Sequence, residues 1–132
     1  MGQLINLKCK KCGYETNLGV GVGRMFNKLD AVISSFDKET QSAIRNLIDG
    51  GGVSWEAYRE IATCERCGKL SAITVFTTSD QNGKSAEYHS KCQCGSADVD
   101  LNDYEKVFGG KATITCPACG DKLEVTMSGY WD

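Results

Sequence analysis

The feature that most constrains this chain is its cysteine pattern, in which eight cysteines form four close pairs and a glycine follows each pair. Two thiolates separated by two residues can point at one tetrahedral ion only if the backbone folds into a tight turn. The glycine supplies the positive φ that such a turn favours. We call these segments knuckles 1 to 4: Cys9-Lys-Lys-Cys12-Gly13, Cys64-Glu-Arg-Cys67-Gly68, Cys92-Gln-Cys94-Gly95 and Cys116-Pro-Ala-Cys119-Gly120.

The eight cysteines match two tetrahedral sites with four sulfur ligands each, and Zn²⁺ is the ion that we expect in both. Iron in one of the two sites is the less favoured alternative. Knuckle 3 has one intervening residue instead of two, so it is predicted to be a tighter turn that still binds the ion. The predicted metal ligands are Cys9, Cys12, Cys64, Cys67, Cys92, Cys94, Cys116 and Cys119.

Two pairings of the knuckles stay open at this point. In the nested scheme knuckles 2 and 3 share one ion and knuckles 1 and 4 share the other, whereas in the sequential scheme the first two pair and the last two pair. A hairpin predicted between knuckles 2 and 3 favours nesting, and the cost of closing the longer loop disfavours it only mildly. Nesting would also bring both chain ends together at one metal.

The chain has 132 residues, which fits one ordinary domain and leaves no room for a large catalytic architecture. Its start lacks the pattern of a signal peptide, and no apolar stretch approaches membrane-spanning length. We therefore expect a cytoplasmic protein without membrane contact, because paired cysteines in a reducing compartment are typical of metal ligands.

The charge of the chain is acidic and uneven. Its formal net charge is −2, and eight thiolates (−8) with two Zn²⁺ (+4) would bring it to −6. Residues 1–69 hold ten Lys or Arg against eight Asp or Glu, whereas residues 70–132 hold five against nine. This balance argues against extended contact with phosphates. We interpret the basic residues around knuckles 1 and 2 as solvated charge: Lys8, Lys10, Lys11, Arg24, Arg66 and Lys69.

Residues 24–62 are predicted to be a helical insertion between knuckles 1 and 2. Apolar residues recur at helical spacing from Met25 to Phe36. Asp37 can cap a second helix that ends at Gly50-Gly51-Gly52. A short third helix is predicted next, with these residues at its cap and on its apolar face: Ser54, Trp55, Tyr58 and Ile61.

The remaining segments are predicted to be antiparallel strands. Residues 70–78 and 85–91 form a hairpin around Asn82-Gly83. A second hairpin or meander is predicted from residues 97–101 and 111–115, and residues 122–127 alternate as a final strand. The predicted fold class is α+β, with small β ribbons and a helical insertion in a single compact unit. Its three parts are residues 1–23 with the first knuckle, residues 24–62, and residues 63–132 with knuckles 2 to 4.

Cys9-x-x-Cys12-Gly13-Tyr14 and Cys116-Pro117-x-Cys119-Gly120 resemble the two metal-binding knuckles of rubredoxin-like zinc ribbons, and this likeness also favours nesting. The chain as a whole resembles small bacterial double zinc-ribbon proteins that open with a C-x-x-C-G knuckle, pass through a glycine-rich turn and helices, and finish near Trp131-Asp132. This resemblance implies metal binding and no particular activity.

Other candidate residues have structural interpretations. His89 is predicted to be a surface residue of a strand, because eight cysteines already fill two sites. The run Gly19-Val-Gly21-Val-Gly23 precedes a predicted helix and could present N–H groups to an anion, but we interpret it as glycines that allow close backbone approach. Four aromatic residues are predicted to fill the core between helix and ribbon: Trp55, Tyr58, Tyr130 and Trp131.

The sequence shows no Ser-His-acid set, no paired-carboxylate motif and no open metal site with a general base, so we predict that the chain is not an enzyme. Our first hypothesis is a protein-interaction or adaptor module made rigid by two structural zinc sites. The alternatives are a nucleic-acid-binding zinc ribbon and a rubredoxin-like iron electron carrier.

Overall fold

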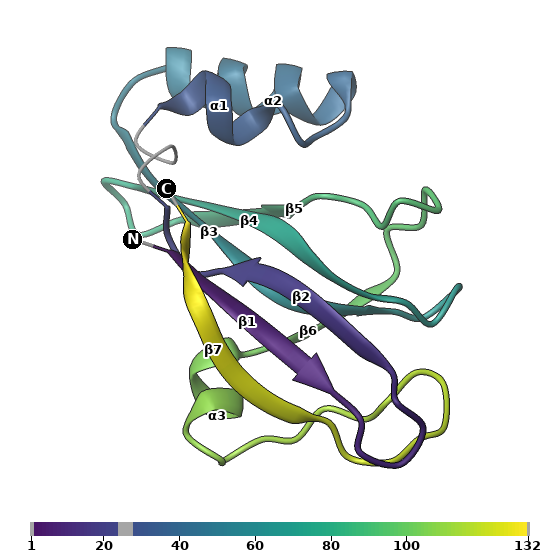
Figure 1. The fold of residues 1–132 in the computed structure, drawn as a ribbon. Coiled ribbons are helices and arrows are strands. Elements are labelled where there is room, and N and C mark those ends of the chain that lie inside the picture. The colour runs from purple at the N-terminus through teal and green to yellow at the C-terminus, as the bar shows by residue number, and fades with distance from the viewer. Residues whose placement is uncertain (1, 24–27, 132) are drawn as a thin grey trace.

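The computed structural model describes residues 2–23 and 28–131, which form an antiparallel β structure with a few short helices (Figure 1). The α+β class is therefore confirmed. One sheet has the strand order β2-β1-β7, and the other has the order β5-β4-β3-β6. The strands are β1 (Gly2–Lys8), β2 (Glu15–Val20), β3 (Val53–Cys64), β4 (Leu70–Asp80), β5 (Ser85–His89), β6 (Val99–Asn102) and β7 (Glu124–Trp131).

The three-stranded sheet places the first and last strands of the chain side by side. Its central strand β1 pairs with β2 and with β7, both antiparallel. On β1 the side chains of Ile5 and Leu7 are fully buried, as expected where alternate residues of a strand face a core. The predicted final strand is confirmed at β7, which continues as far as Trp131.

The four-stranded sheet contains the hairpin that was predicted between knuckles 2 and 3. β4 and β5 are antiparallel, and the N–H of Asp80 donates to the carbonyl of Lys84 at 2.9 Å across the turn. Gly83 adopts φ 81°, which the Asn82-Gly83 signal predicted. The last four residues of β3 pair with β6 on the opposite edge of β3.

The predicted third helix is wrong, because residues 53–64 form strand β3. Trp55, Tyr58 and Ile61 are three residues apart, which is typical of a helix face, but the segment pairs with β4 over residues 53–63. Alternate residues of the strand, Trp55 and Ala57, contact the core below the helices. Long-range pairing with β4 and β6 therefore overrides the local spacing.

The second predicted hairpin is also wrong. Residues 97–101 do not pair with 111–115; instead β6 pairs with β3, and helix α3 (Tyr104–Phe108) follows it. The side chain of Asp103 caps α3 and accepts the N–H of Glu105 at 2.9 Å. This local cap begins a helical turn where the sequence suggested only a loop.

Two further helices, α1 (Leu29–Ile33) and α2 (Lys38–Asp49), lie over one face of the four-stranded sheet (Figure 1). The predicted cap of α2 is confirmed, since the Asp37 carboxylate accepts the N–H of Thr40 at 2.8 Å. Helix α1 is shorter than predicted, and Arg24, Met25 and Phe26 lie outside the described residues. The core between helices α1 and α2 and the sheet comprises Val32, Ile33, Phe36, Ile44, Ala57 and Phe76.

The two sheets meet at a β-bridge between Gly21 and Arg59, whose backbone groups exchange hydrogen bonds of 2.9 and 2.8 Å. A second core lies next to this junction and extends to knuckles 1 and 4. Within residues 2–23 and 28–131, no helix has the length and apolarity that a membrane span requires. The buried members of the second core are Ile5, Leu7, Cys9, Val20, Ile61, Leu70, Val107, Ile114, Cys116 and Leu123.

Candidate metal centres

Knuckles 1, 2 and 4 share one turn geometry. In each, the N–H of the first cysteine donates to the carbonyl five residues later, and the N–H of the glycine donates back to the carbonyl of that cysteine. The glycines have φ values of 83°, 76° and 80°, so the positive φ expected from the sequence is confirmed. The forward bonds are Cys9 to Tyr14 at 2.8 Å, Cys64 to Lys69 at 3.0 Å and Cys116 to Asp121 at 2.6 Å.

Knuckle 3 is the same turn with one residue removed. The N–H of Cys92 donates to Ser96 at 3.0 Å, four residues on, and Gly95 donates to the carbonyl of Cys92 at 2.8 Å. Gly95 has φ 89°. The Ser96 hydroxyl oxygen also accepts the N–H of Asp98 at 3.1 Å. The tighter turn predicted from the shorter spacing is therefore present.

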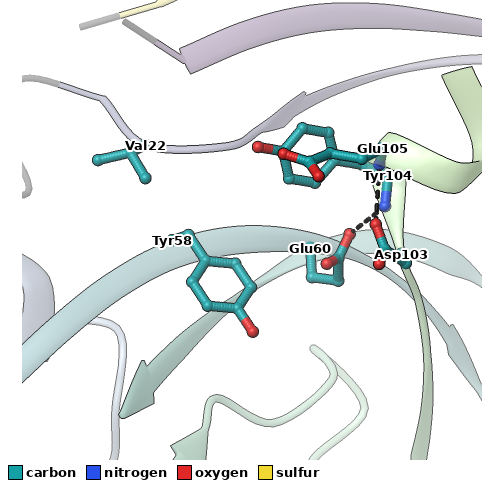
Figure 2. Close-up of a pocket in the computed structure, with 6 residues that line it drawn as sticks. All are labelled: Val22, Tyr58, Glu60, Asp103, Tyr104 and Glu105. Carbon is teal, nitrogen blue, oxygen red and sulfur yellow. Dashed lines mark hydrogen bonds between the residues drawn. The ribbon is translucent and has the colours of Figure 1, made fainter. Parts of the chain in front are cut away.

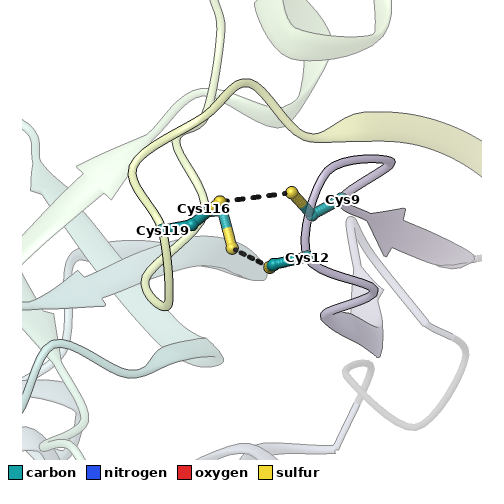
Figure 3. A group of neighbouring side chains, drawn as sticks. All are labelled: Cys9, Cys12, Cys116 and Cys119. Carbon is teal, nitrogen blue, oxygen red and sulfur yellow. Dashed lines mark hydrogen bonds between the residues drawn. The ribbon is translucent and has the colours of Figure 1, made fainter.

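The fold brings the knuckles together in the nested arrangement, and the sequential scheme is wrong. Knuckles 1 and 4 form one group of four sulfur atoms (Figure 3), and knuckles 2 and 3 form another. Within each group, all four sulfur atoms lie within 4.8 Å of one another. The closest contacts are Cys9 with Cys119 at 3.5 Å, Cys12 with Cys116 at 3.5 Å, Cys64 with Cys94 at 3.6 Å and Cys67 with Cys92 at 3.5 Å.

The chain ends do not meet at this metal site, contrary to the expectation attached to nesting. Gly2 pairs with Trp131 at one end of the β1–β7 ladder, and Lys8 pairs with Glu124 at the other. Cys9 follows Lys8, so the first four-cysteine group lies at the far end of these strands. A strand rises about 3.3 Å per residue, which separates the two ends by roughly 20 Å.

The sulfur spacing fits one tetrahedral ion in each group. Four sulfur atoms bound to Zn²⁺ at about 2.3 Å lie about 3.8 Å from one another. The closest observed contacts, 3.5 to 3.6 Å, are near that spacing, and none of the eight thiols is in a disulfide. Only small shifts of side chains would be needed to complete a four-sulfur site.

Each knuckle contributes one buried and one exposed cysteine. The first cysteine is buried in all four, and the second is exposed. Backbone amides also face the buried sulfur atoms: the N–H of Cys67 donates to Sγ of Cys64, and the N–H of Ala118 donates to Sγ of Cys116, both at 3.4 Å. Such donors stabilise a thiolate. Each group therefore lies at the edge of the core, with two sulfur atoms inside it.

The cysteine thiols of these groups differ in pKa. The backbone N–H of Cys12 lowers the pKa of Cys9 to about 7, and that of Cys67 lowers the pKa of Cys64 to about 6. The pKa of Cys92 is raised to about 12, because burial and the neighbouring sulfur atoms outweigh the backbone N–H of Cys94. Four thiolates this close repel one another, so a bound cation is what would allow all four to ionise.

The remaining sequence candidates lie outside both groups. His89 belongs to neither, and its Nδ1 lies 3.3 Å from the carbonyl oxygen of Ser90. Trp55 stacks on Phe76 with ring centroids 5.4 Å apart, and both Trp55 and Trp131 pack against the core below the helices, as predicted. Tyr130 was wrongly predicted to be a core residue, since it is 56% exposed.

A cavity beside β3 is a feature that the sequence did not indicate (Figure 2). Residues of β3 and α3 that are more than 40 positions apart line it together, and no local motif connects them. Only the pairing of β3 with β6, which delivers the chain to α3, brings them to one place. Its lining residues are Val22, Tyr58, Glu60, Asp103, Tyr104 and Glu105.

The fold and its sites define an α+β protein with two groups of four cysteines that could bind metal. Comparisons of the chain with protein-family models, with curated proteins and with solved structures found no match. The functional argument therefore rests on the geometry of this chain alone.

Proposed function

We propose that this chain is a zinc protein with two structural four-cysteine sites, and that the two ions stabilise a non-catalytic scaffold for interactions with other proteins. One observation carries the proposal: eight cysteines from four separate turns converge into two groups in which all sulfur atoms lie within 4.8 Å. The groups join segments distant in sequence, since Cys9 and Cys119 are 110 positions apart.

The donor set supports zinc over harder cations. Thiolates are soft ligands, and four of them in a tetrahedral arrangement are typical of structural zinc or of iron. When bound, Zn²⁺ supplies positive charge that offsets the four thiolates of a group. The chain contributes the turns that aim the sulfur atoms, and the amides of Cys67 and Ala118 donate to the buried ones.

The packing supports a structural role for the ions. Cys9 and Cys116 belong to the core between the sheets, so an ion bound there would connect knuckles 1 and 4 to that core directly. Small domains with limited cores commonly obtain the missing stability from metal. Four protein ligands also leave a tetrahedral ion no open position for a substrate, which supports a non-enzymatic role.

The exposed side chains of the edge strand β7 support an adaptor role over nucleic-acid binding. β7 lies at the edge of its sheet, and Met127 and Tyr130 on it are 49% and 56% exposed. Exposed apolar side chains on an edge strand are typical of protein contacts. On the basic side, Lys10 is paired with Glu124 at 2.8 Å, which reduces the charge available to phosphates.

The decisive experiment is elemental analysis of untagged protein purified in reducing buffer. We expect two equivalents of zinc per chain, a colourless solution and eight thiols that react only after the metal is removed. Iron with absorption in the visible range would identify an electron carrier of the rubredoxin type instead. One equivalent of metal, or eight freely reactive thiols in the native protein, would overturn the proposal. Steeply salt-dependent binding to nucleic acid would reject the adaptor role in favour of the nucleic-acid alternative.

A further inference from the structure

The cavity beside β3 has a volume of about 250 Å³ and is lined by three carboxylates, two tyrosines and one valine. Typical pockets for drug-sized molecules enclose roughly 300–1,000 Å³. This cavity therefore suits a single small group or one side chain. It is separate from both cysteine groups, since none of its lining residues is a cysteine.

Glu60 is the residue of the cavity that most clearly indicates a bound ligand. It is only 7% exposed, and its Oε1 accepts the N–H of Tyr104 at 2.8 Å and the N–H of Ile61 at 3.2 Å. The bond from Tyr104 caps the start of α3, the bond from Ile61 lies within β3, and together they account for one oxygen. The second oxygen, Oε2, has no hydrogen bond to any described residue, and it is not sealed from solvent: the buried side-chain oxygen without a partner among the described residues is Oγ of Ser71. Because Glu60 lines the cavity, this oxygen of Glu60 is available to the N–H donor of a ligand.

Among the described residues that line the cavity, the charged groups are all carboxylates. Asp103 and Glu105 add two more carboxylates, and none of the six lining residues is a Lys, Arg or His. The ion pairs found in residues 2–23 and 28–131 involve other carboxylates. Desolvation, together with the charges of Asp103 and Glu105, raises the pKa of Glu60 to about 7, despite the two backbone N–H donors. A bound cation would relieve this repulsion.

Two tyrosines complete the lining. Figure 2 shows the rings of Tyr58 and Tyr104 on either side of the space next to Glu60. The face of an aromatic ring attracts a cation, most strongly when the cation leaves water. An alkyl-ammonium or guanidinium group would find carboxylate oxygens for its N–H donors and aromatic faces for its apolar stem. A bare metal ion has no apolar stem to pack against the rings.

We propose that this cavity binds an organic cation through its ammonium or guanidinium group, which pairs with Oε2 of Glu60 between Tyr58 and Tyr104. The same chemistry is available from a small free amine and from a lysine or arginine side chain of a partner protein. The inference does not depend on the identity of the metal ions, because the cavity shares no residue with the cysteine groups.

The test is a titration of the ¹⁵N-labelled full chain, as purified, with n-butylammonium chloride, followed by NMR. We expect saturable shifts of the amide signals of Tyr58, Glu60 and Tyr104, and none with the neutral analogue n-butanol. A blocked Ala-Lys-Ala peptide forms the second arm. Tighter binding of the peptide than of butylammonium would identify a protein side chain as the source, and equal or weaker binding would identify a free amine.

Glu60→Gln is the decisive variant, because a glutamine oxygen can still accept the two backbone N–H groups while the charge is lost. We expect binding to weaken about tenfold or more, as for loss of a hydrogen bond to a charged group. Glu56→Gln is the matched control, with the same charge change on the same strand, at an exposed position outside the lining. Its affinity should stay close to that of the unmodified chain.

Glu105→Gln provides a second variant in case Glu60→Gln does not fold. Glu105 is exposed at the rim, so its loss should weaken binding only about two- to fivefold without disturbing the core. Equal binding of n-butanol and n-butylammonium, shifts located elsewhere, or unchanged affinity in a folded Glu60→Gln protein would overturn the proposal. Unchanged affinity in Glu105→Gln, if that is the only folded variant, would do the same.

Discussion

The indole N–H of Trp131 donates a hydrogen bond of 2.9 Å to the carbonyl oxygen of Val20, which joins the last described residue to the end of β2. The Arg59 guanidinium lies over the same ring, 4.9 Å from its centroid. A Cβ added at Gly2 or Gly23 would overlap the ring, and one at Gly19 would lie 3.2 Å from it. Gly2, Gly19 and Gly23 therefore leave space for the Trp131 ring, where the sequence suggested only close backbone approach.

Gly23→Ala should destabilise the protein, because the new methyl group would collide with the Trp131 ring. Overpacking of this kind costs about 1–3 kcal/mol in the free energy of unfolding, which urea denaturation would measure. Gly129→Ala is the control, since a Cβ there meets Leu4 at an ordinary 3.6 Å. Equal stability of the two variants would show that the ring moves aside without cost.

Cys94→Ser should lose one of two zinc equivalents and no more, and Cys67→Ser should do the same. Both cysteines belong to the group formed by knuckles 2 and 3, so the shorter knuckle 3 should matter as much as knuckle 2. His89→Ala should keep both ions, because His89 lies in neither group. Measurement of the metal content per chain tests these predictions. Two zinc equivalents in Cys94→Ser would show that Cys94 is not a metal ligand.

Removal of the metal with a chelator should unfold the sheets. Structural zinc contributes about 10–16 kcal/mol of apparent binding free energy, which is comparable to the whole stability of a domain, about 5–15 kcal/mol. Helix α2 has 12 residues, and isolated helices of that length are marginal in water. Chelation should therefore abolish near-ultraviolet circular dichroism and leave at most partial helicity, and Zn²⁺ should restore the fold. A chelated protein with an unchanged melting temperature would contradict a structural role.

Glu60 should make the protein less stable as the pH rises. Burial raises the pKa of Glu60 from 4.5 to about 7, so the folded chain holds this proton more tightly than the unfolded chain does. The stabilising effect is fully present below about pH 4.5 and is lost as the pH rises through about 7. Relative to the unmodified chain, Glu60→Gln should gain about 1–3 kcal/mol in unfolding free energy between pH 5 and pH 8.

Denaturation of the unmodified chain and of Glu60→Gln across this pH range would measure the difference in their unfolding free energies. Contributions from the cysteines are the same in both proteins and cancel in that difference. Parallel stability curves for the unmodified chain and Glu60→Gln would show that the carboxyl of Glu60 has the same pKa in the folded and unfolded states.

The features that the sequence predicted correctly are those that depend on neighbouring residues. Asn82-Gly83 forms the predicted turn, Asp37 caps α2 as expected, and each glycine after a cysteine pair adopts a positive φ. These outcomes depend on steric freedom and on hydrogen bonds within a few positions, so a short window of sequence contains the information. The spacing of the cysteines alone likewise indicated four turns of one kind.

The tertiary structure alone decided which distant segments meet. Local spacing could not show that residues 53–64 pair with β4 and β6 and are therefore a strand, because the apolar residues fit a helix as well. The sequence favoured the nested pairing of the knuckles but left the sequential one open, and only the packed sheets brought Cys9 next to Cys119. The cavity around Glu60 had no local signal at all. Contacts between residues far apart are selected by the burial of shared cores and by strand pairing, and both depend on the whole chain at once.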